Sequence, residues 1–167
     1  QGRALGQKCF RNFTGGYAGP KTMRWGLEQS RNLMTVRLAN NTGMDKVVKL
    51  IDTMGIGNYA PVLSISLGAG DTTVLNLTNA YSILANGGKK VSPTLIDLVQ
   101  DRHGKTLYRA DPRLCEGCEA NDWTGGAMPQ PADVRKQAMD TVTAYQVVHM
   151  LEGVVERGTA MVLRDLD

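Results

Sequence analysis

The sequence predicts an α+β protein of about the size of one ordinary domain. Apolar residues recur at helical spacing through most of the chain before Val91 and again near its end, whereas a period-two pattern begins only after that residue. The 167 residues are 42% hydrophobic and 21% charged, a composition that allows a globular protein to bury a core. Separate helical and strand regions of this kind indicate the α+β class.

Helical spacing and helix-ending residues predict five helices. Gly19-Pro20 is expected to start the first, because Pro fits a first helical position where its missing N–H is not needed. Asp71 or Thr72 is expected to cap the fourth helix. The predicted helices cover residues 22–29, residues 33–40, a segment that begins at Met44 and ends before Gly55, residues 73–85 and residues 142–157.

Alternating residues after the fourth helix predict a β-hairpin. Residues 94–100 and 105–109 are its strands, and the turn between them makes His103 an exposed turn residue. Residues 161–166, which follow the last helix, are expected to approach a strand.

The remaining segments are predicted to be loops. Residues 1–18 lack a sustained period and are expected to form an irregular lead-in. Residues 110–137 are rich in Pro, Gly and polar residues and are expected to form a long surface excursion. The Gly-rich stretch 64–73 lacks the Lys of a P-loop and the third Gly of a dinucleotide-binding fingerprint, so a tight turn is expected there and no cofactor.

Charge and hydropathy argue against several classes of partner. The net charge is +3 and the basic residues are scattered, so neither nucleic acid nor anionic lipid is expected to be the main partner. The two helices joined across Gly43 lack the basic face of a DNA-reading helix-turn-helix. No apolar run approaches the roughly 20 residues of a membrane span. We therefore expect a soluble segment, and its ends at Gln1 and Asp167 are expected to be cuts within a longer protein.

Three cysteines exclude a dense disulfide framework. Cys9 is isolated, whereas Cys115 and Cys118 could close a small disulfide loop or supply half of a zinc site. His103 and His149 stand alone, so no second pair of ligands completes such a site and no metal is predicted.

The triplet Ser30-Arg31-Asn32 is the candidate catalytic element. It lies between the first two predicted helices, where a bend would turn the Ser30 hydroxyl and the Asn32 carboxamide toward one cleft and Arg31 elsewhere. Such residues also cap helices or satisfy local backbone groups, so the triplet alone does not establish a function.

Several segments share the order and spacing of one known family. These segments are Arg24-Trp25-Gly26-Leu27-Glu28-Gln29-Ser30-Arg31-Asn32, Ser66-Leu67-Gly68-Ala69-Gly70, Ala80-Tyr81, Leu84-Ala85-Asn86-Gly87-Gly88, Pro93-Thr94-Leu95-Ile96 and Met150-Leu151-Glu152-Gly153-Val154-Val155-Glu156-Arg157-Gly158-Thr159-Ala160. Together they resemble the transpeptidase domain of class A penicillin-binding proteins, in particular the bifunctional 1a type of Gram-negative bacteria. The resemblance runs from about Gly19 to Ala160, and residues 1–18 and 113–133 match it poorly.

The resemblance implies a fold and a chemistry. The fold is that of penicillin-binding proteins and serine β-lactamases, present incompletely over residues 19–167 as a helical subdomain with part of an antiparallel sheet. The chemistry is acyl transfer on the D-Ala-D-Ala end of a peptidoglycan stem peptide, with acylation by β-lactam antibiotics. In the family a Ser-x-x-Lys serine attacks, a Ser-x-Asn triplet lines the cleft and a Lys-Thr-Gly strand binds the substrate carboxylate.

By this resemblance Ser30 and Asn32 are catalytic residues. Ser30 matches the second serine, which carries a proton between the motif lysine and the leaving amine, and Asn32 matches the amide that holds that lysine and the substrate backbone. The parent protein would be anchored in the inner membrane and face the periplasm. The resemblance leaves open whether the parent also polymerises glycan.

The sequence departs from the family pattern at two motifs. None of its five serines is followed three residues later by Lys, and no Lys-Thr-Gly occurs. We therefore expect the chain to be the middle of the domain and, without the nucleophile, to be inactive alone. Absent flanking strands would leave apolar edges exposed, so marginal stability or self-association is expected. The alternatives are a β-lactamase-like hydrolase of the same fold and a non-catalytic, helix-rich interaction module.

Overall fold

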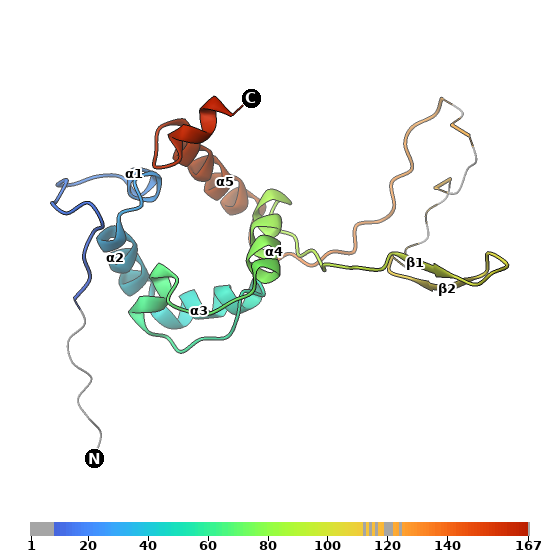
Figure 1. Ribbon diagram of the computed structural model, residues 1–167, viewed down its shortest axis with the longest axis horizontal. Coiled ribbons are helices and arrows are strands. Elements are labelled where there is room, and N and C mark those ends of the chain that lie inside the picture. The colour runs from blue at the N-terminus through green and yellow to red at the C-terminus, as the bar shows by residue number, and fades with distance from the viewer. Residues whose placement is uncertain are drawn as a thin grey trace, which may run out of the picture. The chain divides into compact units, whose positions relative to one another are not determined.

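The computed structural model of the chain describes residues 9–166, apart from residues 112, 114, 116, 119–121 and 124. These residues form two compact units (Figure 1). The first unit runs as far as Lys90 and resumes at Gln137, and the second is the segment Val91–Lys136 between them. Among the described residues, no helix has the length and apolarity that crossing a membrane requires.

The first unit is helical, and each of the five predicted α-helices is confirmed. Its α-helices are α1 Met23–Glu28, α2 Asn32–Thr42, α3 Met44–Thr53, α4 Val74–Ala85 and α5 Thr141–Glu156, and its 3-10 helices are η1 Leu63–Leu67 and η2 Met161–Asp165. Side-chain oxygens of Thr22, Thr73 and Asp140 cap α1, α4 and α5 by accepting from a backbone N–H three residues on.

Two predicted helix starts are wrong by one to three residues. The cap of α4 is Thr73, not Asp71 or Thr72, and α1 begins after the Thr22 cap, so Pro20 lies before the helix. In both cases the residue that can bond a backbone N–H inside the first turn decides the boundary.

The prediction of a strand approach at residues 161–166 is also wrong. These residues form η2, in which the Leu163 N–H bonds the Ala160 carbonyl, and η2 contacts α5. Among the described residues, this segment pairs with no strand. Its backbone groups are therefore satisfied locally, as in a 3-10 turn.

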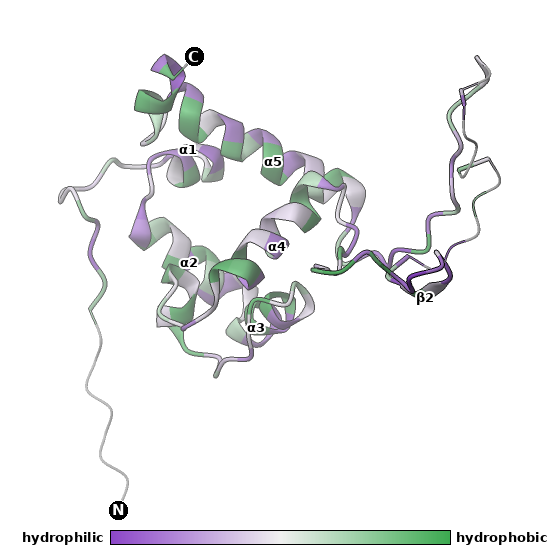
Figure 2. Cartoon of the chain, turned by 45° about the vertical axis from the view of Figure 1, so that its right-hand side comes forward, coloured by the Kyte–Doolittle hydropathy of each residue, from purple (hydrophilic) through white to green (hydrophobic). Residues whose placement is uncertain are grey.

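The helices of the first unit contact both their neighbours in sequence and helices far along the chain. Helix α5 contacts α1, α4 and η2, and α2 contacts α1, α3 and η1 (Figure 1). The buried apolar residues are Val36, Ala39, Ala80, Ile83 and Ala144. Helices α4 and α5 also carry large apolar side chains that remain exposed, namely Val74, Leu75, Leu77, Tyr81, Val142 and Tyr145. Figure 2 shows hydrophobic residues, in green, along both helices.

The two points where the chain leaves and re-enters the first unit are joined. The Ala138 N–H bonds the Gly88 carbonyl at 2.8 Å, and the Gln137 side chain donates to the Gly87 carbonyl at 2.8 Å. Gly88 has φ 83°, and a Cβ on it would lie 2.9 Å from the Gln137 Nε2 atom. Glycine at this position therefore permits both the turn and the close approach.

The second unit contains the predicted hairpin, which is confirmed. Strands β1 (Leu98–Gln100) and β2 (Thr106–Arg109) pair antiparallel. The Asp101 carboxylate accepts from the backbone N–H groups of His103 and Lys105, which closes the turn and leaves His103 exposed. The first strand begins at residue 98 rather than 94. In the excursion that follows, Cys115 and Cys118 are joined by a disulfide.

Candidate active site

The triplet Ser30-Arg31-Asn32 forms the turn between α1 and α2. The Ser30 N–H donates to the Leu27 carbonyl at 3.0 Å, and the Arg31 N–H donates to the Gly26 carbonyl at 2.9 Å. This pair of bonds is the Schellman motif, in which the residue after the C-cap takes the left-handed conformation. Ser30 is that residue, with φ 50°.

The same pair of bonds ends α3, η1 and α4, and there the left-handed residue is glycine each time. These glycines are Gly55, Gly68 and Gly87. Among the described residues, Ser30 is the one non-glycine residue with positive φ. A Cβ in this conformation costs about 1 kcal/mol, and residues kept under such strain occur preferentially at functional sites.

The Ser30 side chain is exposed, and its hydroxyl has no hydrogen-bond partner within residues 9–166 as far as these are described. A serine at a left-handed position often bonds the local backbone, which would account for its presence structurally. That account does not apply to Ser30. Its hydroxyl is available to donate a proton to, or accept one from, another molecule or segment.

Asn32 opens α2 and is half-buried. Its Nδ2 atom donates to the Arg11 carbonyl at 3.0 Å. Because only the NH₂ end of a carboxamide donates, this bond sets the orientation of the amide and leaves Oδ1 as the acceptor. An acceptor oriented in this way suits an ammonium or a backbone N–H.

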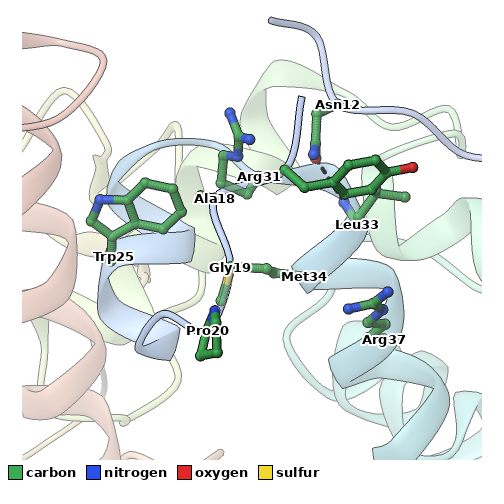
Figure 3. Close-up of a pocket in the computed structure, with 10 residues that line it drawn as sticks. Asn12, Ala18, Gly19, Pro20, Trp25, Arg31, Leu33, Met34 and Arg37 are labelled. Atoms are coloured by element: carbon green, nitrogen blue, oxygen red, sulfur yellow. Dashed lines mark hydrogen bonds between the residues drawn. The ribbon is translucent and has the colours of Figure 1, made fainter. Parts of the chain in front are cut away.

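The Arg31 side chain extends to the lead-in segment. Its guanidinium donates to the Thr14 hydroxyl at 2.9 Å and to the Gly16 carbonyl at 3.3 Å, and it lies 5.5 Å from the centroid of the Trp25 ring. Arg31 lines a pocket of about 360 Å³ with residues 17–20 and the first turns of α2 (Figure 3). Ser30 and Asn32 do not line this pocket.

The residues before the triplet are bound to the end of α5. Glu28 is only 4% exposed, and its carboxylate accepts from Arg157 Nη2 at 2.7 Å and from Arg157 Nε at 3.1 Å. The Glu28 hydrogen bonds raise the pKa of Arg157. The Gln29 side chain donates to the Arg157 carbonyl, and the Thr159 N–H donates to the Glu28 carbonyl, both at 3.1 Å.

The sequence alone does not predict the pairing of Glu28 with Arg157, because the two residues lie 129 positions apart. One signal was present: Gly153 stands inside a strong helical pattern, where an isolated glycine has a packing or functional reason. A Cβ on Gly153 would lie 2.8 Å from Glu28 Cδ, and a Cβ on Gly158 would overlap the Glu28 carbonyl. Both glycines make room for Glu28.

Neither histidine shares a hydrogen bond or an ion pair with the triplet among the described residues. His103 is in the hairpin turn, and the exposed His149 side chain lies 3.0 Å from the Glu152 carboxylate on the surface of α5. Within the described part of the chain, no group of three or more His, Cys, Asp or Glu side chains is placed to hold a metal ion.

Comparisons with known proteins agree on one family. The family model described as the penicillin-binding protein transpeptidase domain matches residues 2–165, a range that includes the lead-in and the excursion. Penicillin-binding protein 1A of Rickettsia bellii is 44% identical over 90% of this chain and 19% of that protein. Its counterpart in Rickettsia prowazekii is 40% identical over 99% of this chain and 22% of that protein. The chain thus spans about a fifth of the length of these relatives.

Solved structures show the same fold. The chain superposes on penicillin-binding protein 1A of Haemophilus influenzae with a TM-score of 0.78 at 24% identity, over 99% of this chain and 28% of that one. It superposes on the D,D-transpeptidase domain of a peptidoglycan glycosyltransferase from Eggerthella lenta with a TM-score of 0.63 at 22% identity, over 89% and 40% of the two chains. The predicted fold class and the resemblance are confirmed, and the chain belongs to the penicillin-binding protein transpeptidase family.

Proposed function

We propose that this chain supplies one wall of the active site of a serine-type D,D-transpeptidase, which cross-links peptidoglycan stem peptides at D-Ala-D-Ala and is acylated by β-lactams. The observation that carries the proposal is the Ser30 turn. A hydroxyl without a protein partner among the described residues stands at a strained position, two residues before an amide of fixed orientation. Strain of this kind is retained where it positions a reacting group.

The two side chains have different roles in this mechanism. The Ser30 hydroxyl accepts a proton from one partner and donates its own to another, and so carries a proton between the lysine of a Ser-x-x-Lys motif and the leaving amine. The Asn32 Oδ1 atom accepts from that lysine or from the substrate backbone. Neither is the nucleophile. Attack requires a serine activated by a neighbouring base, and this chain contains no Ser-x-x-Lys.

The proposal extends to the whole protein. Relatives named penicillin-binding protein 1A are about five times as long as this chain, which leaves room in the parent for both remaining motifs, for a membrane anchor and for a glycan-polymerising domain. The parent would act on the periplasmic face of the inner membrane.

The proposal is tested with a chimera. This chain replaces the matched stretch of the Rickettsia bellii penicillin-binding protein 1A, and the chimera and the isolated chain are each incubated with a fluorescent penicillin. We expect a covalently labelled band for the chimera and none for the isolated chain. Substitution of the chimera's Ser-x-x-Lys serine by alanine is the control and should abolish the label. A folded chimera without label, or label on Ser30 of the isolated chain, would contradict the proposal.

A further inference from the structure

We infer that the Glu28–Arg157 ion pair is a positioning device that holds the Ser30 turn in its strained conformation. Glu28 is two residues before Ser30 and is its nearest strongly buried neighbour in sequence. The catalytic consequence of this inference rests on the proposed function, whereas the structural part stands without it.

The geometry of the pair fits positioning. Two parallel N–H···O bonds fix the plane of the Glu28 carboxylate, which a single-point ammonium contact would not do. The Glu28 backbone is held as well, since its carbonyl accepts from the Thr159 N–H. The end of α1 is therefore attached to the end of α5 through both the side chain and the main chain.

The turn is restrained on its other side too. The Asn32 side chain bonds the Arg11 carbonyl, and the Leu33 N–H bonds the Asn12 Oδ1 atom at 3.1 Å. Ser30 thus lies between two attached segments, while its own side chain is free of partners in the described structure. A left-handed non-glycine residue persists only where its surroundings determine the backbone, and here the two flanks do so.

Packing alone does not explain the Glu28–Arg157 ion pair. Only the Glu28 side of the pair is buried, since the Arg157 side chain is 48% exposed, and such an ion pair contributes little net stability compared with apolar residues of similar volume. Its retention is accounted for by the specificity of the geometry, because two glycines, Gly153 and Gly158, leave the space that Glu28 occupies.

The test measures amide hydrogen exchange on the full 167-residue chain. We expect Glu28→Gln to speed exchange at the Ser30 and Arg31 amides by about tenfold or more, because these two bonds open without global unfolding. The Gly87 and Gly88 amides make the same pair of bonds at the end of α4 and should keep their rates. Arg157→Lys, which keeps the charge and loses the paired geometry, should give a smaller increase at the same two amides and serves if the first variant fails to fold.

Glu156→Gln is the matched control. Glu156 contacts the same guanidinium at 2.7 Å through Nη1, but its side chain is 61% exposed and, within the described part of the chain, it makes no hydrogen bond or ion pair with α1. We expect no change at the Ser30 and Arg31 amides. Unchanged exchange in both Glu28→Gln and Arg157→Lys, or an equal increase at all four amides, would overturn the inference.

A second measurement separates the inference from the proposed function. In the Rickettsia bellii chimera, Glu28→Gln should lower the rate constant of penicillin acylation about tenfold or more and leave the noncovalent affinity unchanged, since the interaction is needed in the transition state. Weaker affinity at an unchanged rate constant would overturn the catalytic half of the inference. An unlabelled parent chimera would instead count against the proposed function, and the exchange result would still decide the structural half.

Discussion

Ser30 occupies a backbone position at which glycine is the less strained residue. Its φ is 50°, and the corresponding positions after α3 and α4 hold Gly55 and Gly87. The Cβ in this region crowds the following carbonyl oxygen, so the serine costs the folded state about 1 kcal/mol relative to an unstrained residue. The serine hydroxyl is thus present at the expense of stability, a cost that the proposed proton-carrying role would account for.

Replacing Ser30 by glycine should therefore stabilise the chain. We expect the free energy of unfolding of the Ser30→Gly variant to be about 0.5–1 kcal/mol higher than that of Ser30→Ala, because only glycine adopts the left-handed conformation without strain. Urea denaturation of the two variants measures this difference. Ser82→Gly, in the interior of α4, is the control and should lower the free energy of unfolding by about 1 kcal/mol. Equal stability of the two Ser30 variants would show that the turn is not strained.

The sequence located the triplet but not its conformation. Nothing local marks Ser30 as left-handed, because the usual marker of that position is glycine. The contacts of Asn32 with Arg11 and of Arg31 with Thr14 could not be predicted either, because residues 1–18 show no hydrophobic period that would indicate the path of this segment.

At the scale of elements, the contact between α1 and α5 determines the position of the Ser30 turn. Gly153 lies within α5, where glycine normally weakens a helix by about 1 kcal/mol relative to alanine. Here it lets Glu28 enter between the two helices. The helix contact and the ion pair therefore depend on the same residue.

This dependence predicts that the effect of Gly153→Ala on the free energy of unfolding changes sign when Glu28 is removed. Gly153→Ala should destabilise the chain by about 1–3 kcal/mol, because its Cβ would overlap the Glu28 carboxylate. In a Glu28→Ala background the one close atom left is Arg157 Nη2, the end of a flexible side chain that has lost its Glu28 partner and can move aside. The same substitution should then be neutral or stabilising by up to about 1 kcal/mol. A double-mutant cycle measured by urea denaturation gives the coupling. Additive effects of the two substitutions would contradict the proposed packing.

The elements were predictable to different degrees. All five α-helices were predicted, α3 from apolar residues at i, i+3, i+4 and i+7, and the six-residue α1 from the Gly19-Pro20 pair before it. The segment 161–166 is too short for its apolar residues to distinguish a strand from a helical turn, and the outcome depends on whether a partner strand is present. The ion pair between Glu28 and Arg157 needs the tertiary fold and could not be read from either segment alone.

At the scale of the whole molecule, the first unit buries few large side chains. Ile83 is the one large residue below 2% exposure in the described structure, and the other buried apolar residues are Val36 and three alanines. A core of this size supports only modest stability. The expected tendency toward marginal stability or self-association stays a prediction, and concentration-dependent sedimentation of the chain would measure it.

The family assignment and the geometry of the turn together lead to one mechanism. The chain matches a transpeptidase family over nearly its full length but holds neither the nucleophilic serine motif nor the Lys-Thr-Gly strand. What it holds is the Ser30 turn, with the flanking bonds that fix it. The central claim is that Ser30 and Asn32 act on a nucleophile supplied from outside this chain.

The most direct test is the rate of penicillin acylation in the Rickettsia bellii chimera after single substitution of the triplet. We predict that Ser30→Ala and Asn32→Ala each lower the acylation rate constant by about 10²-fold or more, the range of a lost proton-transfer or positioning group. Ser82→Ala and Asn40→Ala, which remove the same groups elsewhere on α4 and α2, should leave it unchanged. Acylation at the unsubstituted rate in both Ser30→Ala and Asn32→Ala would contradict the assignment of this turn to the active site.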